Sequence, residues 1–262
     1  MLGRKSPPAR HANDAGRHAL VVDEAGDPAG TPVLYLHGGG DSRLSRHPDD
    51  SIAAALGVRL VALDRCGPAR RFASLRAWAE ATAAALELER FGVVGWSAGG
   101  PHALALAAVA PERVSRVALV GSMPPVDLVG ELQRDVRAAM RAARISPRVA
   151  ARGLERWGRL PTPPTGDAAC DEAYTRGRVE SFRHGGLWLA RELAYLGRPW
   201  AFELADVRAP VSLWWGRGDQ VCPPRIGEAF AERLPDAELH LVEGTHQLLF
   251  SRWRDLLADV SR

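Results

Sequence analysis

The stretch that decides the fold is FGVVGWSAGGP, residues 91–101. It runs from apolar and glycine residues into Gly-x-Ser-x-Gly and then into a run rich in Ala and Leu. This motif is informative only where a buried strand precedes the serine and a helix follows it. A sharp turn would hold Ser97 at strained backbone angles, so Gly95 and Gly99 must lack a Cβ that would collide. The stretch therefore predicts a nucleophilic serine lifted above the edge of a sheet.

Five further apolar runs predict buried strands at 33–36, 58–63, 114–120, 211–215 and 239–242. Their apolarity is continuous rather than alternating, which is typical of strands covered on both faces. Helical stretches separate the runs, at 75–89, 98–110, 225–234 and 248–260. Strands interleaved with helices predict a parallel α/β sheet that has helices on both faces.

The pattern changes over residues 122–204, where no run resembles a strand. This segment is helical in tendency and is interrupted by Pro147 and by a proline-rich stretch at 161–166. We therefore expect residues 16–121 and 205–262 to form one α/β core, with 122–204 inserted into it as a helical lid.

The composition is that of an ordinary globular chain, with 262 residues, 46% of them hydrophobic and 25% charged. A net charge of +3 is too small to indicate nucleic-acid binding. No apolar run approaches the length of a membrane-spanning helix. Residues 1–15 are expected to be a disordered leader without the apolar core of a secretory signal, which makes the cytoplasm the default location.

Three cysteines, Cys66, Cys170 and Cys222, are far apart in the sequence. Their odd number and wide spacing exclude a disulfide framework and a CxxC metal site. We expect Cys66 and Cys222 to be small buried hydrophobic residues. No metal and no cofactor are expected. The sequence carries no signal for an oligomeric state.

A serine hydroxyl is a poor nucleophile and needs a base and an orienting acid. When the serine sits on such a strand-turn-helix, the acid and then the histidine follow it in the chain. His246 lies between the last predicted strand and the last predicted helix, so it is the candidate base. Asp219 follows the strand at 211–215 and is the candidate acid, with Asp127 as the alternative.

An oxyanion hole needs two backbone N–H groups aimed at the developing alkoxide. Ala98 would supply one from the start of a helix, whose dipole favours negative charge there. Gly39 would supply the other from a glycine loop, which lacks the sequence of a phosphate-binding loop. His37, Trp96 and Trp188 are candidates for binding substrate, although the tryptophans suit core packing as well.

Five motifs occur in one order: LHGGG at 36–40, LDR at 63–65, GWSAGGP at 95–101, WGRGD at 215–219 and GTH at 244–246. Together they resemble the α/β-hydrolase fold superfamily, in particular its small bacterial members with a helical lid. The resemblance covers roughly residues 20–260. It implies a mostly parallel sheet of eight strands and a triad of Ser97, Asp219 and His246.

Two departures from this resemblance alter the walls of the expected cleft. The usual glycine-rich loop after Asp-Arg is replaced here, beyond Arg65, by CGPARR. The first glycine loop continues as Asp41-Ser42-Arg43 instead of the Pro-Gly of proline iminopeptidases, which makes an aminopeptidase less favoured. A serine at position 97 argues against the branches that use a carboxylate nucleophile.

Arginines recur at steps of three or four within the expected lid, at Arg134, Arg137, Arg141, Arg144, Arg148, Arg152, Arg156 and Arg159. On a helix they would share an arc of about 120°. We call them the arginine band. Two interpretations are open, because the band is either a solvated helix face or a surface that attracts an anionic substrate handle such as a carboxylate, coenzyme A or an acyl carrier protein.

The leading functional hypothesis is a serine hydrolase that acts on an ester, lactone or thioester through an acyl-enzyme. A second hypothesis uses the same triad for acid–base chemistry in cyclisation, elimination or C–C cleavage. A third is a ligand-binding protein that keeps the fold and has lost turnover. The identity of the substrate depends on the lid, where motifs carry least information.

Overall fold

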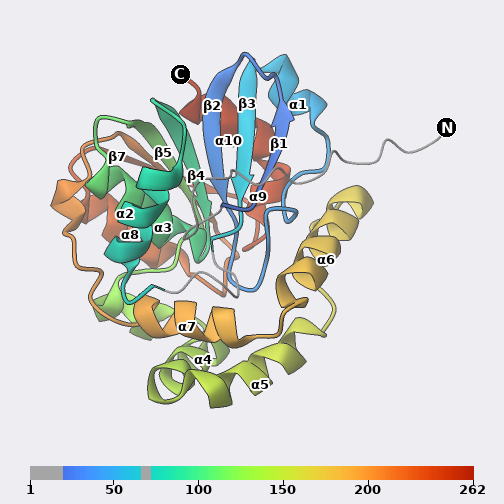
Figure 1. Cartoon of the computed structure of the whole chain (residues 1–262), viewed down its shortest axis with the longest axis vertical. Coiled ribbons are helices and arrows are strands. Elements are labelled where there is room, and N and C mark those ends of the chain that lie inside the picture. Colours follow the sequence, from blue (N-terminus) through green and yellow to red (C-terminus); the bar gives the residue numbers. More distant parts are fainter. Residues whose placement is uncertain (1–19, 66–71) are drawn as a thin grey trace.

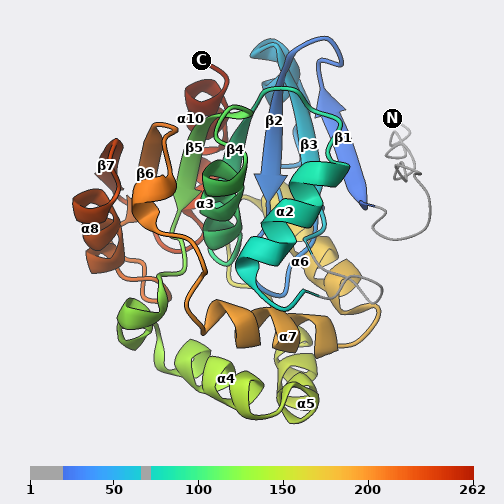
Figure 2. The ribbon, with the colours of Figure 1, turned by 60° about the vertical axis from the view of Figure 1, so that its left-hand side comes forward.

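The computed structural model describes residues 20–65 and 72–262. One sheet runs through the molecule and helices cover both of its faces (Figures 1 and 2). The predicted leader at 1–15, Cys66 and the rest of the loop after Arg65, up to residue 71, lie outside the described residues.

The strands of the described residues are β1 Val22–Gly26, β2 Thr31–Leu36, β3 Val58–Leu63, β4 Phe91–Trp96, β5 Val114–Val120, β6 Val211–Gly216 and β7 Ala237–Val242. They form one seven-stranded sheet in the order β1-β3-β2-β4-β5-β6-β7, whereas the resemblance implied eight strands. β1 pairs antiparallel with β3, and every other pair of neighbours is parallel. The expected fold class, a mostly parallel sheet covered by helices, is confirmed.

Alternate side chains of the central strands enter two separate cores. In β2, Leu34 and Leu36 pack into one core, while Val33 and Tyr35 point through to the other. Successive side chains of a strand point to opposite faces, so a strand buried on both faces must be apolar throughout. This is why the continuous apolar runs identified the sheet.

The helices of the described residues are α1 Ser51–Ala55, α2 Leu75–Ala85, α3 Gly99–Val109, α4 Arg134–Ile145, α5 Pro147–Gly158, α6 Ala168–Phe182, α7 Leu187–Leu196, α8 Pro224–Arg233, α9 Leu248–Ser251 and α10 Trp253–Val260, with 3₁₀ turns at Val126–Glu131 and Leu204–Asp206. Helices α2, α3 and α8 cover one face of the sheet, and α1 and α10 cover the other (Figure 2). Helices α4, α5 and α7 lie beyond the carboxyl ends of the strands (Figure 1). No helix in the described part of the chain has the length and apolarity that crossing a bilayer requires.

The side of the sheet on which the chain adds its next strand changes between β2 and β4. β2 continues to β3 on one side, and β4 continues to β5 on the other. In open α/β sheets the crevice at such a switch point, outside the carboxyl ends of the strands, is where ligands bind. The glycine loop after β2 and the serine turn after β4 both begin at this point.

Candidate active site

Ser97 lies in a left-handed turn between β4 and α3. Its φ is 52°, a conformation that non-glycine residues rarely adopt. The backbone N–H of Ser97 donates to the carbonyl oxygen of Val120 at 2.9 Å. The carbonyl oxygen of Ser97 accepts from the N–H groups of Gly100 and Met123, both at 3.0 Å. Neighbouring backbone therefore holds the strained residue from both sides.

The turn exists only because glycines flank it. A Cβ on Gly99 would lie 2.1 Å from the carbonyl oxygen of Leu36, and a Cβ on Gly95 would lie 2.8 Å from the carbonyl oxygen of Gly99. Gly100 is constrained in the same way, since its Cβ would lie 2.0 Å from the Ser122 hydroxyl. The predicted need for glycine at 95 and 99 is confirmed, and position 100 adds to it.

The candidate acid and base are hydrogen-bonded to each other. His246 Nδ1 lies 2.8 Å from Asp219 Oδ2, and the two residues are 8% and 4% exposed. The other carboxylate oxygen of Asp219 accepts from the N–H groups of Val221 and Cys222, both at 2.9 Å. The indole N–H of Trp96 donates to the carbonyl oxygen of His246 at 2.9 Å. Both side chains are therefore held in one orientation, with the imidazole Nε2 left for another partner.

Asp127, the alternative acid, lies away from this pair. It is on the 3₁₀ turn after β5, where its carboxylate accepts from Arg233 of α8 at 2.6 Å in an exposed ion pair. Asp219 follows β6, so it reaches the carboxyl edge of the sheet where His246 and Ser97 also lie. The hydrogen bond to His246 therefore distinguishes Asp219 from Asp127.

A cavity of about 780 Å³ contains both Ser97 and His246 in its wall. Helices α4, α5 and α7 supply about half of the remaining wall, which is largely apolar, with Val136, Leu154 and Leu189 among its side chains. No hydrogen bond joins the Ser97 hydroxyl to the imidazole within the described part of the chain. Such bonds are often long in the absence of substrate and tighten in the substrate complex.

The two candidate oxyanion donors belong to adjacent backbone segments. Gly39 lies in the cavity wall, and a Cβ placed on it would lie 3.4 Å from the Cβ of Ala98. Ala98 immediately precedes α3, where the N–H groups of the first turn have no partner inside the helix. Neither the Gly39 nor the Ala98 N–H donates to another group among the residues described.

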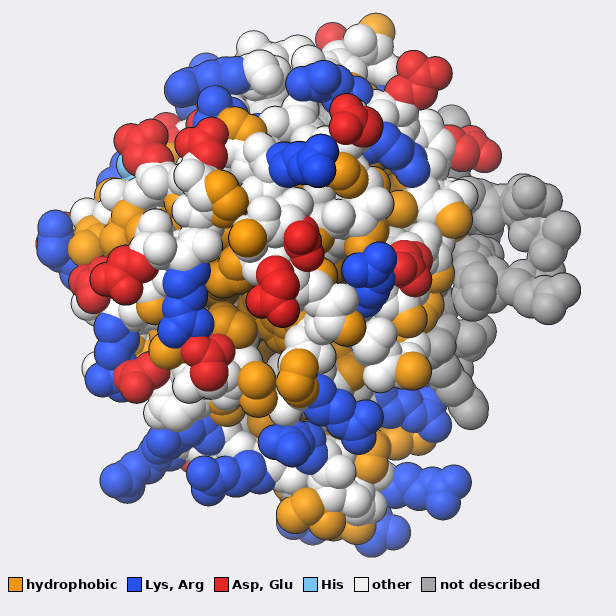
Figure 3. Space-filling model, turned by 90° about the vertical axis from the view of Figure 1, so that its left-hand side faces the viewer, with side chains coloured by type: hydrophobic (Ala, Val, Ile, Leu, Met, Phe, Trp, Pro, Cys, Tyr) orange, Lys and Arg blue, Asp and Glu red, His pale blue; other side chains and the backbone are white. Residues whose placement is uncertain are grey.

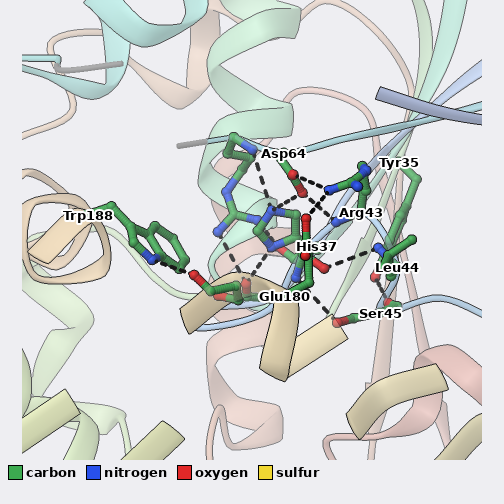
Figure 4. A network of polar contacts seen from close by, with 12 residues as sticks. Tyr35, His37, Arg43, Leu44, Ser45, Asp64, Glu180 and Trp188 are labelled. Atoms are coloured by element: carbon green, nitrogen blue, oxygen red, sulfur yellow. Dashed lines mark hydrogen bonds and ion pairs between the residues drawn. The ribbon is translucent and has the colours of Figure 1, made fainter. Parts of the chain in front are cut away.

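Of the three residues expected to bind substrate, Trp96 lines the cavity, whereas His37 and Trp188 do not. His37 is 2% exposed and lies beneath the glycine loop, where its ring contacts the Gly38 carbonyl and the Arg65 N–H (Figure 4). Trp188 lies on α7, and its indole N–H donates to the carbonyl oxygen of Ser181 at 2.9 Å. His37 and Trp188 are thus placed behind the wall of the cavity.

A charged pair in the same cavity was not found by sequence reasoning. Asp41 and Arg178 both line it and are 3% and 4% exposed, with Asp41 Oδ1 and Arg178 Nε 3.5 Å apart. The guanidinium stacks over the ring of Trp157 at 4.1 Å. Burial raises the pKa of Asp41 to about 6, and Arg178 opposes part of that rise. Residues so far apart in sequence carry no local signal of such a pairing.

Comparison with known proteins identifies the family. The model of the alpha/beta hydrolase fold family matches residues 31–144. A pimeloyl-[acyl-carrier protein] methyl ester esterase of Aromatoleum aromaticum is 33% identical over 206 residues, which cover 72% of this chain and 79% of the relative. The chain belongs to the α/β-hydrolase fold family. A second esterase of the same name, from Chromobacterium violaceum, is 31% identical over 256 residues, covering 91% of this chain and 95% of the relative.

Solved structures share the fold over nearly the whole chain. A probable hydrolytic enzyme from Pseudomonas aeruginosa superposes with a TM-score of 0.71 at 20% identity, covering 97% of this chain and 94% of that one. An esterase from Rhodococcus sp. gives a TM-score of 0.65 at 23% identity, covering 92% and 95%. Together with the sequence matches, they confirm the expectation of an α/β-hydrolase-fold enzyme.

The glycine requirement at the turn is testable through stability. We expect Gly99→Ala to lower the free energy of unfolding by about 1–3 kcal/mol, because its Cβ would overlap the Leu36 carbonyl of β2. Gly130→Ala is the matched control, since no atom lies within 4 Å of a Cβ there. Urea denaturation measures both variants, and equal stability of the two would contradict this steric explanation.

The buried carboxyl of Asp41 predicts a pH-dependent stability. Its pKa is about 6 in the folded protein against 3.8 for an unperturbed group, so the folded state binds the proton more tightly. The stability that this proton contributes is present below pH 3.8 and is lost as the pH rises through 6. Between about pH 4 and pH 8, the unfolding free energy of the wild type should fall by about 2 kcal/mol relative to Asp41→Asn. A difference that stays constant across this range would show that Asp41 does not titrate as stated.

Proposed function

We propose that this protein is a serine ester hydrolase that works through Ser97, His246 and Asp219. The observation that carries the proposal is the 2.8 Å hydrogen bond between His246 Nδ1 and Asp219, beside a cavity that Ser97 also lines. The strained turn at Ser97 adds to it, because backbone strain of this kind concentrates at functional sites. The esterase names of the two curated relatives agree with this chemistry.

The proposed reaction has two acyl-transfer steps. The Ser97 hydroxyl oxygen attacks the ester carbonyl carbon while His246 Nε2 takes its proton, and Asp219 stabilises the imidazolium. The tetrahedral oxyanion is stabilised by the N–H groups of Gly39 and Ala98. Collapse of this intermediate expels the alcohol, which takes the proton from His246. Water then attacks the acyl-enzyme with His246 as base, releasing the acid and regenerating the Ser97 hydroxyl.

We infer that the helical segment at 122–204 is the lid of this site and that the substrate's acyl chain occupies the cavity beneath it. Helices α4, α5 and α7 of the segment contribute most of the apolar wall. A cavity of about 780 Å³ with few polar groups suits an extended acyl chain better than a sugar or a peptide. Trp96 lies in the wall next to the nucleophile and would contact the acyl group.

We further infer that the acyl group arrives on an acidic carrier protein that docks on the arginine band. Seven of its arginines lie on two helices, because α4 ends at Ile145 and Pro147 opens α5, as the proline predicted, and Arg159 directly follows α5. None of its eight arginines forms an ion pair with a described acidic side chain, and all but Arg137 are exposed. Figure 3 shows basic side chains gathered at the end of the molecule where Figure 1 has these helices. Both relatives are named for a carrier-linked substrate.

The nucleophile is tested by covalent labelling. A fluorophosphonate probe should label Ser97 in the folded protein, because Ser97 and the imidazole of His246 line the same cavity. Ser97→Ala should abolish labelling and lower kcat for a p-nitrophenyl ester by roughly a thousandfold or more. Ser51→Ala, at an exposed serine of α1, is the control and should leave both unchanged. Wild-type protein that binds acyl esters without labelling at Ser97 would favour non-hydrolytic chemistry or a binding role.

The arginine band is tested by charge reversal. We expect Arg141→Glu combined with Arg148→Glu to raise KM for a methyl ester carried on acyl carrier protein by roughly tenfold or more, since opposite charges steer such encounters. KM for a small neutral ester should not change. Arg90→Glu combined with Arg254→Glu reverses two exposed charges elsewhere and is the matched control. Equal effects of the two pairs, or equal salt dependence for both substrates, would leave the band as a solvated surface.

A further inference from the structure

Beneath the glycine loop lies a buried ion pair that the proposed reaction does not use. Arg65 follows β3 and Glu192 lies on α7, and both side chains are fully buried. Arg65 Nε donates to one oxygen of the Glu192 carboxylate and Nη2 to the other, each at 3.0 Å. A pair of this kind contributes little more stability than apolar side chains of the same volume. The other contacts of the Arg65 guanidinium indicate the role of this ion pair.

The same guanidinium binds two backbone carbonyls of the glycine loop. Arg65 Nη1 donates to the carbonyl oxygen of His37, and Nη2 lies 3.3 Å from that of Gly38. The Gly38 oxygen is also 2.8 Å from His37 Nδ1. Burial and the charge of Arg65 hold the pKa of His37 well below its usual value, so its ring is neutral. Because His37 Nε2 accepts from the Arg65 N–H at 3.4 Å, the ring proton is on Nδ1 and is donated to Gly38.

Two donors thus converge on the carbonyl of Gly38, which shares a peptide unit with the N–H of Gly39. That unit is planar, so fixing the carbonyl oxygen on the inner side fixes the direction of the N–H on the other. A hydrogen bond to the carbonyl also polarises the peptide and strengthens its N–H as a donor. The Gly39 N–H is the one proposed for the oxyanion, and Gly39 lies in the cavity wall.

We propose that Arg65, held by Glu192, is a positioning residue that aims and polarises the Gly38–Gly39 peptide as an oxyanion donor. His37 is the second support of the same peptide. Arg65 touches neither substrate nor nucleophile in this arrangement and acts only through the backbone that it binds. This inference deepens the proposed function and rests on it.

The same cluster reaches Ala98, the residue that carries the other candidate donor. His102 of α3 contacts the carbonyl oxygen of Ala98 through Nδ1 at 2.7 Å and the hydroxyl of Tyr195 through Nε2 at 2.8 Å. Nε2 also lies 3.5 Å from Glu192. Burial lowers the pKa of His102, so this imidazole is neutral and the Glu192 charge is matched by Arg65. The Ala98 carbonyl belongs to the peptide unit that follows the Ala98 N–H, so His102 holds the backbone next to this donor and not the donor's own peptide unit. Helix α7 contacts His102 through Glu192 and Tyr195.

Helix α6 holds the next part of the loop. Figure 4 shows Arg43 between Asp64 and Glu180, with Arg43 Nη1 at 2.6 Å and 3.2 Å from their carboxylates. The ion pairs of Arg43 with Glu180 and of Asp41 with Arg178 connect the loop after β2 to α6. The ion pair of Arg65 with Glu192 connects the same loop to α7. The helical segment between β5 and β6 thus supports the loop in addition to forming the cavity wall.

The test separates loss of positioning from loss of folding. Arg65→Lys keeps the charge and removes the planar fork, and Glu192→Gln keeps the shape and removes the partner charge. The double variant Arg65→Met with Glu192→Leu removes the buried pair without leaving a lone charge, so it should fold. Arg113→Lys is the control, because Arg113 also binds backbone carbonyls, those of Leu86 and Leu88, far from the site.

We expect the three Arg65 and Glu192 variants to unfold cooperatively and to lose roughly 10- to 100-fold in kcat for a p-nitrophenyl ester, with KM changed less than about threefold. Affinity for a trifluoromethyl ketone, which forms an anionic adduct with the serine, should fall by the same factor. Affinity for the matching methyl ketone should not fall. Arg113→Lys should lower Tm and leave kcat unchanged.

Two outcomes would overturn the inference. One is a folded double variant with the kcat of the wild type. The other is a loss of kcat that merely follows the fraction of enzyme labelled in an active-site titration, because this indicates a structural role alone. Both require a wild type that hydrolyses esters and labels at Ser97, so they are distinct from failure of the proposed function.

Discussion

The left-handed turn at Ser97 is the constraint on which the rest of the site depends. It brings a hydroxyl above the carboxyl edge of the sheet only because no side chain stands at Gly95, Gly99 or Gly100. The same turn starts α3, which places the Ala98 N–H at the positive end of a helix dipole. The position of the proposed nucleophile and part of its electrostatic environment therefore follow from one backbone conformation.

Parallel topology gathers the other groups around this turn. Gly39, Asp219 and His246 come from the loops after β2, β6 and β7, and parallel strands bring their carboxyl ends to one edge. The helical segment between β5 and β6 covers that edge and adds charged contacts to the loop after β2. In the proposed mechanism, the core and the insertion both orient the backbone donors, so changes in the insertion should affect the chemistry as well as substrate choice.

Much of the sheet could be predicted because strands buried on both faces are apolar throughout. β1 was missed because its sequence, VDEAG, is charged and lies at an antiparallel edge. The motif order predicted which loops carry Ser97, Asp219 and His246, and the hydrogen bond between the last two follows from the strand order. The final helix was expected to be continuous but is divided into α9 and α10 at Arg252.

The ion pairs that helices α6 and α7 form with Arg43 and Arg65 could not be predicted. Arg65 and Glu192 are 127 positions apart, and Arg43 and Glu180 are 137 apart. No local pattern indicates that such residues meet, since the meeting depends on how α6 and α7 pack on the loop after β2. His37 was a candidate for binding substrate, yet its ring contacts the Gly38 carbonyl and is not part of the cavity wall.

The most direct measurement is a crystal structure of the protein after reaction with a phosphonate ester. We predict a covalent bond from Ser97 Oγ to phosphorus, with one phosphoryl oxygen about 2.7–3.1 Å from the backbone nitrogens of Gly39 and Ala98. The imidazole of His246 should lie within hydrogen-bond distance of Oγ or of the leaving-group oxygen. An adduct on another residue, or a phosphoryl oxygen directed away from both backbone nitrogens, would contradict the proposed site.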